Sequence, residues 1–273
     1  MEAAKNRKPS VSIVIPVHNE AAHIQACLDS IARQTIAPKE VIIVDNNSTD
    51  NTVELARTYP RVTVVPAKKQ GIVHARNVGF DTASADIIAR SDGDIVLPET
   101  WVEHIQNFYA EPENLQKCWT SGGYFYNVRL PHLVSWAYSL YAFWFNKLLI
   151  GYFTLWGSSM AVTRKQWQAV RGSVHKRTDI HEDLDLTIHL AEAGYKIEYD
   201  RTIKTRAELR RVHTDRHKLW EYLQWWPRTL RMHKMWQWLP CWLLTVIPLY
   251  SAVYVLVVWD NLVRLFGRPK LPY

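Results

Sequence analysis

Short apolar runs alternate with stretches of helical periodicity through the first half of the chain. The runs are rich in β-branched residues, a composition typical of buried strands. After the first run, Ile24, Leu28 and Ile31 recur at the spacing of one helix face. The expected strands are 11–17, 41–44, 62–65 and 86–89, and the helices after the second and third are 52–59 and 72–82. This alternation predicts an α/β fold with a Rossmann-like, mostly parallel sheet, helices on both faces and the ligand beyond the carboxyl ends of the strands.

The second half continues the pattern with a long interruption. We expect a helix from Pro98 through Phe108, strands over 118–126 and 157–162, and a helix from about 182 to Gly194. The segment 133–156 is dense in Trp, Tyr, Phe and Leu and is broken mainly by Asn146 and Lys147. Two interpretations stay open for it: an interfacial helix or wall of an acceptor site, and a buried core helix.

Acidic residues collect where the expected strands end. Glu20 follows the first strand, Asp45 closes the second, and Asp92 and Asp94 form an acidic turn after the fourth. Alternate side chains of an extended segment point the same way, so the two aspartates can face one point, and Gly93 would let a ligand approach closely. Carboxylates suit Mg²⁺ or Mn²⁺ shared with phosphate oxygens, although a solvated turn has the same composition. No glycine-rich phosphate-binding pattern is present, which favours phosphate held through a metal.

The composition of the chain limits the classes of binding partner that we expect. The 273 residues carry a formal charge of +7, which favours anionic partners, but no RNA-recognition pattern or basic repeat is present, so no nucleic acid is expected. Thirteen Trp and thirteen Tyr suit a membrane interface or a sugar-stacking surface as well as a core. Cys27, Cys118 and Cys241 are odd in number, widely spaced and without a Cys-x-x-Cys pair, so they indicate neither a disulfide framework nor a zinc site. The charged first ten residues lack the apolar core of a secretory signal.

Four sequence blocks together resemble glycosyltransferase family 2. They follow the family's order and spacing within roughly residues 10–200. The blocks are Val14–Glu20, Val44–Asp50, Gly71–Gly79 and Asp92–Asp94. The resemblance implies a GT-A fold, a nucleotide-sugar donor and transfer with inversion at the anomeric carbon.

Carried over position by position, the resemblance assigns donor binding to six residues. Asp92 and Asp94 match the pair that binds metal and diphosphate; Asp94 is the expected direct ligand, and Asp92 either touches ribose or reaches the metal through water. Asp45 is expected to face the base. The full donor-binding set is Pro16, Glu20, Asp45, Arg76, Asp92 and Asp94.

Some of these positions also have a purely structural interpretation. Asn19 and Asp50 could cap helices, and Arg76 could be a surface residue of its helix. Asn46 departs from the family, where a second aspartate is common, so the details of base recognition stay open.

A second acidic block is expected to activate the acceptor. Gly157 and Ser158 match the small residues with which the family lines the donor sugar and acceptor. Glu182 and Asp183 match its Glu-Asp motif, which implies Asp183 as general base and Glu182 as a positioning residue. Acidic residues at a helix start also complement the helix dipole, and Asp185 is the alternative base.

The C-terminal region is expected to lie at a membrane. Residues 220–236 mix Trp with basic residues like an amphipathic helix at a lipid surface. Trp238–Trp259 is an uncharged run of 22 residues, about 33 Å as a helix against a hydrocarbon core of about 30 Å. Two prolines within it leave a span, a re-entrant or interfacial hairpin and an oligomer contact as alternatives. His213 is either a third metal ligand or phosphate contact, or part of a solvated basic face.

The expected domains are a tail at 1–10, a catalytic domain at 11–214 and a membrane-associated region at 215–273. The donor half of the catalytic domain would be 11–97 and the acceptor half 98–214.

These patterns predict a metal-dependent inverting glycosyltransferase of hexosyltransferase type, on the cytoplasmic face of a membrane as a peripheral or single-span protein. It would use Mn²⁺ or Mg²⁺, a nucleotide-sugar donor, preferentially a UDP-sugar, and a hydroxyl of a glycan or lipid-linked acceptor. Residues 224–228 only partly match the Gln-x-x-Arg-Trp motif of processive relatives, which favours single additions. A polyprenyl-phosphate glycosyltransferase and a non-catalytic nucleotide-sugar-binding scaffold are the alternatives, and a homo-oligomer could form through the apolar C-terminal region.

Overall fold

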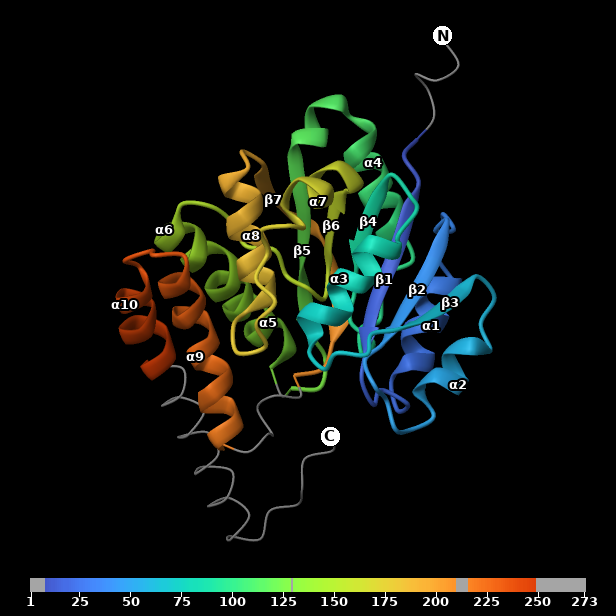
Figure 1. Ribbon diagram of the computed structural model, residues 1–273, viewed down its shortest axis with the longest axis horizontal. Coiled ribbons are helices and arrows are strands. Elements are labelled where there is room, and N and C mark those ends of the chain that lie inside the picture. The colour runs from blue at the N-terminus through green and yellow to red at the C-terminus, as the bar shows by residue number, and fades with distance from the viewer. Residues whose placement is uncertain (1–7, 129, 210–215, 249–273) are drawn as a thin grey trace, which may run out of the picture.

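A seven-stranded sheet forms the centre of the protein in the computed structural model, which describes residues 8–128, 130–209 and 216–248 (Figure 1). The strand order is β3-β2-β1-β4-β6-β5-β7. The strands are β1 (Val11–Val17), β2 (Glu40–Asp45), β3 (Val62–Pro66), β4 (Ile87–Arg90), β5 (Lys117–Phe125), β6 (Met160–Thr163) and β7 (Lys196–Ala207).

Helices cover both faces of this sheet. The α-helices are α1 (Ile24–Ala32), α2 (Thr52–Arg57), α3 (Ile72–Thr82), α4 (Trp101–Ala110), α5 (Pro131–Ser139), α6 (Asn146–Ile150), α7 (Arg164–Val170), α8 (Glu182–Glu192), α9 (Arg216–Met232) and α10 (Trp238–Cys241). A 3₁₀ helix, η2 (Pro112–Gln116), and two π-type segments, η3 (Leu140–Phe145) and η5 (Trp242–Val246), join them.

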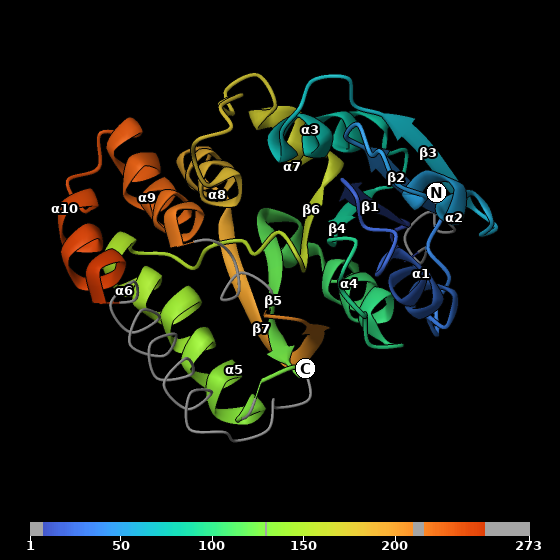
Figure 2. The same cartoon turned by 90° about the horizontal axis from the view of Figure 1, so that it is seen from below.

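Alternation along β1 builds the two layers of the core. Ile13 and Ile15 pack with the helices α1 and α4, whereas Val14 packs with α3, α7 and α8 on the other face. Figure 2, viewed from below, shows these two helix layers on either side of the sheet. The expectation of a sheet covered on both faces is therefore confirmed.

The sheet is mixed rather than parallel throughout. β1 to β4 pair in parallel as the sequence predicts, but β6 runs antiparallel to both β4 and β5. β7 pairs in parallel with β5 and was not predicted from the sequence. Its burial alternates, with Ile197, Tyr199, Ile203, Thr205 and Ala207 buried, and this two-residue period was the available signal.

The aromatic segment after β5 forms one continuous helical run over 131–150 with one buried and one exposed side, so the interpretation of it as a buried core helix is wrong. Through α5, η3 and α6 one face packs on the sheet, where Phe143 stacks on Tyr199 of β7 at 3.9 Å between ring centroids. The two polar residues that break the apolar run have local partners. Asn146 is buried and its Nδ2 donates to the carbonyl of Ala142, and Lys147 Nζ lies 4.2 Å from the centroid of the Phe153 ring.

The C-terminal helices pack beside α6 and α8 (Figure 1). Leu230 of α9 and Cys241 of α10 are buried against Leu184 and Ile188 of α8. Within the part of the chain that the structure describes, no helix combines the length and the apolar character needed to cross a bilayer. The predicted run Trp238–Trp259 lies partly outside the described residues, so the predicted span is not tested there.

Candidate active site

The acidic positions predicted from the sequence meet at the carboxyl ends of β1, β2 and β4. The parallel register pairs Val17 with Asp45, so both strands end at the same edge. A side chain at Gly93 would place its Cβ 3.0 Å from Val17 Cγ1 and 3.4 Å from Glu20 Cγ. The expectation that Gly93 leaves room for a ligand is therefore corrected: the missing side chain lets the acidic turn pack against the end of β1.

Asp92 and Asp94 of the turn and the neighbouring Glu20 bring three carboxylates close to the buried thiol of Cys27. Burial raises the pKa of the Cys27 thiol, and the negative charges of Asp94, Asp92 and Glu20 raise it further. Oε2 of Glu20 also lies 3.1 Å from Nδ1 of His23, within hydrogen-bond distance. Carboxylate oxygens such as these are the ligands that a hard divalent cation prefers.

Arg90, the last residue of β4, joins the two acidic blocks. Its side chain is only 1% exposed. Nη2 donates to Asp92 Oδ1 at 3.0 Å, and Nη1 donates to Glu182 Oε1 at 3.0 Å and to Asp183 Oδ1 at 2.7 Å. One buried guanidinium thus holds the acidic turn against the first residues of α8.

Gly157 and Ser158 also contact these carboxylates, and their expected role in lining the donor sugar and acceptor stays a prediction. The backbone N–H of Gly157 donates to Asp183 Oδ2 at 2.8 Å, and Ser158 Oγ donates to Asp92 Oδ2 at 2.6 Å. A Cβ on Gly157 would lie 2.6 Å from Asp183 Oδ2 and 2.7 Å from Arg90 Cζ. The absence of a side chain at residue 157 is therefore required for Arg90 and Asp183 to meet.

The neighbouring carboxylates Glu182 and Asp183 have opposite pKa shifts. Burial raises the pKa of Asp183, and the charge of Glu182 adds to this, bringing it to about 7 despite Arg90. Burial alone would also raise the pKa of Glu182, but the positive charges of Arg90, His181 and Arg76 lower it to about 2. Of this buried pair, Asp183 is therefore the carboxyl whose pKa is raised and which holds its proton to higher pH.

Arg76 is fully buried, so the interpretation of it as a surface residue is wrong. Its Nη1 donates to the backbone carbonyl of Glu182 at 2.7 Å, and its Nε and Nη2 donate to Asn77 Oδ1. These bonds place Arg76 beneath the first turn of α8. Its predicted contact with the donor stays a prediction.

The remaining nucleoside-pocket candidates lie on β1 and β2. Pro16 is buried within β1, and Asp45 Oδ1 accepts the backbone N–H of Ser48 at 2.9 Å. Asn51 is the N-cap residue of α2, and Asp50, one position before it, accepts the N–H of Thr52 through Oδ1. Asn19 Oδ1 accepts the N–H of Thr49 and caps no helix.

Asn46, the departure from the family pattern, has a structural role. It is buried, and its Nδ2 donates to the carbonyls of Ala67 and Lys69 while its Oδ1 accepts the N–H of Gly71. An aspartate could not make the two donations. The amide therefore fixes the loop that leads into α3.

Asp185, the alternative base, points elsewhere. It is fully buried and accepts hydrogen bonds from His175 and His233, away from the carboxylates around Arg90. His181, before Glu182, contacts Tyr222 and Trp226 of α9, so α9 borders the start of α8. His213 lies outside the described residues.

Two groupings of His and acidic side chains among the described residues are close enough to hold a metal. They are His175–Asp185–His189–His233 and His181–Glu182–Asp183, and neither contains Asp92 or Asp94. A cation on the acidic turn would therefore need further ligands from a bound diphosphate, water or residues outside the described part of the chain.

The sequence did not predict the role of Arg90. An ionisable residue at the end of a buried strand, directly before the acidic turn, was the signal, because a buried charge requires a partner. Its partners could not be named, since Glu182 and Asp183 lie 92 and 93 residues away.

Comparison with known proteins covers Arg90, the acidic turn, Gly157 and Ser158, whereas the family match ends before Glu182 and Asp183. The sequence model of the family described as Glycosyl transferase family 2 matches residues 12–167, more than half of the chain. Glycosyltransferase AglE of Haloferax volcanii is 41% identical over 103 residues, which are 35% of this chain and 34% of that protein. The chain therefore spans about a third of the length of this relative.

Two solved structures resemble the fold. The mannosyltransferase PcManGT from Pyrobaculum calidifontis, in complex with GDP-Man and Mn²⁺, has a TM-score of 0.67 at 19% identity, covering 98% of this chain and 78% of that one. A fragment of S. aureus TarS in complex with UDP-GlcNAc has a TM-score of 0.57 at 17% identity, covering 79% and 64%. The GT-A fold expected from the sequence is thereby confirmed.

Proposed function

Because the chain belongs to glycosyl transferase family 2, we propose that it transfers a sugar from a nucleotide-diphosphate donor to a hydroxyl of its acceptor. The observation that carries the proposal is the joining of both acidic blocks by Arg90, which lies within 3.0 Å of Asp92, Glu182 and Asp183. A leaving-group site and a base are thus held in one arrangement.

Asp183 would act as the general base. Its pKa of about 7 leaves a substantial ionised fraction at neutral pH, and a base is most effective when its pKa is near the working pH. Arg90 donates one hydrogen bond to Asp183 Oδ1, and the N–H of Gly157 donates one to Oδ2. Each carboxylate oxygen can accept a second hydrogen bond, so Asp183 can still accept the proton of an acceptor hydroxyl.

The transfer balances as a single displacement. The acceptor hydroxyl loses its proton to Asp183 as its oxygen bonds to the anomeric carbon, while the bond from that carbon to the diphosphate oxygen breaks. The nucleoside diphosphate departs with the electron pair. Displacement from the opposite face would invert the anomeric centre.

Asp94 would hold Mn²⁺ or Mg²⁺, with Asp92 fixed by Arg90 and Ser158 beside it. Both oxygens of Asp92 already have protein partners, which favours its indirect role. When bound, such an ion neutralises charge on the departing diphosphate. PcManGT binds GDP-Man with Mn²⁺ and TarS binds UDP-GlcNAc, so a donor test should include both nucleotides. A UDP-sugar remains our preferred donor.

A membrane location on the cytoplasmic face fits an exposed apolar face of the molecule. Leu133, Trp136, Leu140, Trp144 and Leu148 recur every three or four residues through α5, η3 and α6, and are 39–85% exposed. Leu239, Leu243 and Leu244 add exposed apolar side chains on the adjoining α10 and η5. We call these eight residues the apolar face. A lipid-linked or envelope glycan is the acceptor that suits it, with one sugar added at a time.

Asp183→Asn is the direct test. With the donor found by screening UDP- and GDP-sugars against membrane extract in Mn²⁺, kcat should fall about 10²–10⁴-fold because the base is removed, while donor binding is retained. Asp179→Asn is the matched control: the Asp179 side chain is partly exposed and pairs with Arg177 and Arg228, so its neutralisation should leave transfer unchanged. Wild-type turnover by Asp183→Asn would refute the base assignment and point to a phosphate acceptor, which needs little base catalysis.

A further inference from the structure

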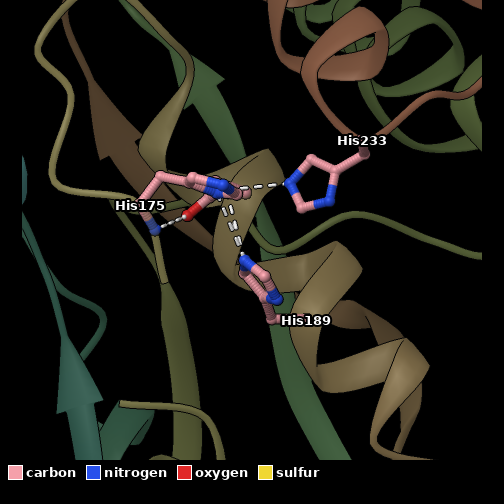
Figure 3. A group of neighbouring side chains, drawn as sticks. His175, His189 and His233 are labelled. Carbon is pink, nitrogen blue, oxygen red and sulfur yellow. Dashed lines mark hydrogen bonds and ion pairs between the residues drawn. The ribbon is translucent and has the colours of Figure 1, made fainter. Parts of the chain in front are cut away.

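A second cluster of chemically active side chains lies behind the proposed base. His175 comes from the loop between α7 and α8, Asp185 and His189 lie one turn apart in α8, and His233 directly follows α9. Figure 3 shows the three imidazole rings converging from these separate segments. One atom from each of the four side chains lies within 4.8 Å of the other three.

The distances match the edges of a metal coordination shell. Asp185 Oδ1 lies 2.7 Å from His175 Nδ1, 2.8 Å from His233 Nε2 and 3.6 Å from His189 Nε2, and the two nitrogens of His175 and His189 are 3.3 Å apart. Four ligands about 2.0–2.1 Å from a tetrahedral ion are separated from one another by about 3.3 Å. The observed distances bracket that value.

Hydrogen bonding alone does not account for this convergence. The second oxygen of Asp185 accepts the backbone N–H of His175, which leaves Oδ1 to face three ring nitrogens. It can accept from two of them. His189 Nε2 is left 3.3 Å from His175 Nδ1, whose single proton already points to Asp185. A cation would instead use the lone pairs of all three rings.

The surroundings also suit a metal ligand set. The side chains of Asp185, His233 and His189 are 0%, 4% and 11% exposed, and His175 closes the site from the surface at 37%. The other ring nitrogen of His189 lies 3.6 Å from the Glu192 carboxylate, an arrangement that orients metal-binding histidines.

We propose that His175, Asp185, His189 and His233 bind a structural Zn²⁺ ion. Three imidazoles and one carboxylate in a closed, four-ligand arrangement are typical of zinc. The ion would fasten α9 and the loop 171–181 to α8, whose first turn carries Glu182 and Asp183. It is separate from the hard-cation site on the acidic turn, and it contains no cysteine, which is why the sequence did not reveal it.

Metal content of the full-length protein tests the proposal. Purified without chelators from zinc-supplemented cells, the wild type should hold about one zinc per chain and, after EDTA treatment, rebind Zn²⁺ with a Kd below about 100 nM. Zn²⁺ should raise the thermal midpoint of the EDTA-treated protein. Zinc content below about a tenth of an equivalent, with no change in midpoint, would overturn the proposal whether or not any variant folds.

Three variants locate the ion. His175→Ala, at the most exposed ligand, should weaken Zn²⁺ binding by at least about 100-fold, more than loss of an outer partner would. His104→Ala is the matched control, because His104 lies on α4 and its Nδ1 contacts the carbonyl of Thr100, the N-cap residue of that helix, at 2.9 Å. Asp94→Ala should keep the zinc. If zinc is lost with Asp94→Ala and kept with His175→Ala, the ion belongs to the acidic turn and the assignment is wrong.

Discussion

Arg90 is the residue on which the two halves of the site depend. A guanidinium removed from water is stable here because three carboxylates surround it, and their charges raise its pKa above the usual range although burial opposes this. The same contacts orient Asp92 and Asp183, so Arg90 is a positioning residue for both.

Arg90→Met should therefore reduce both stability and transfer. Removing the cation leaves Glu182, Asp183 and Asp92 buried or partly buried without their shared partner, which should lower the free energy of unfolding by about 3–5 kcal/mol in urea titrations. Arg171→Met removes an exposed pair with Asp81 and should cost no more than about 1 kcal/mol. Equal losses in the two variants would contradict the role given to Arg90.

The protonation of Asp183 should set the acid limb of the pH–rate profile. Because the base must be ionised, kcat should rise with pH through about 7. The Glu182 charge contributes to that raised pKa, so Glu182→Gln should move the limb to lower pH. A limb that stays in place in Glu182→Gln would show that another group controls the rate.

The same pKa has a consequence for stability. It lies above the unfolded value of about 3.9, so the folded state binds more protons and its advantage is lost as pH rises from about 4 through about 7. The wild type should consequently lose unfolding free energy between about pH 5 and pH 8, whereas Asp183→Asn should not show this loss. The difference between the two unfolding free energies should therefore shift in favour of Asp183→Asn as pH rises. The lowered pKa of Glu182 places its own titration below this window.

At the scale of elements, buried polar side chains hold the loops between strands and helices in place, and local sequence patterns do not reveal these roles. Asn46 ties the end of β2 to the loop that enters α3, the helix that carries Arg76. Asn46→Asp should cost about 2–4 kcal/mol of unfolding free energy, because the carbonyls of Ala67 and Lys69 lose their donor and a carboxylate is buried beside them. Asn47→Asp, at an exposed position with bonds to the same loop, should cost clearly less. An equal cost would show that burial of Asn46 is unimportant.

Elements with strong local periodicity were predicted well, and the others were not. Parallel strands β1 to β4 and the helix α3 have continuous apolar runs or clear helical spacing. β7 alternates charged and buried residues, and its neighbour in the sheet, β5, comes from residues far earlier in the chain. The π-type turn of η3 depends on Asn146 bonding to Ala142, a contact that apolar periodicity does not encode.

At the scale of the whole molecule, the apolar face defines one side. The formal charge of +7 would add attraction to anionic lipid, so vesicles with anionic headgroups are the appropriate probe. Trp136→Glu combined with Leu148→Glu should reduce co-sedimentation with such vesicles by about 10–100-fold, since two large apolar side chains no longer enter the interface. Leu115→Glu, at an exposed leucine on η2, is the control. Unchanged co-sedimentation of the double variant would exclude this face as the membrane contact.

The sequence by itself determined the parallel half of the sheet and the edge at which the acidic residues meet. Both follow from local rules, because apolar periodicity specifies strands and helices and parallel strands present their carboxyl ends together. Only the tertiary structure decided which charges are partners. Burial of Arg76 and Arg90, the divergent pKa values of Glu182 and Asp183, and the convergence of three histidines on Asp185 all depend on distances between segments far apart in the chain, and no local pattern contains those distances.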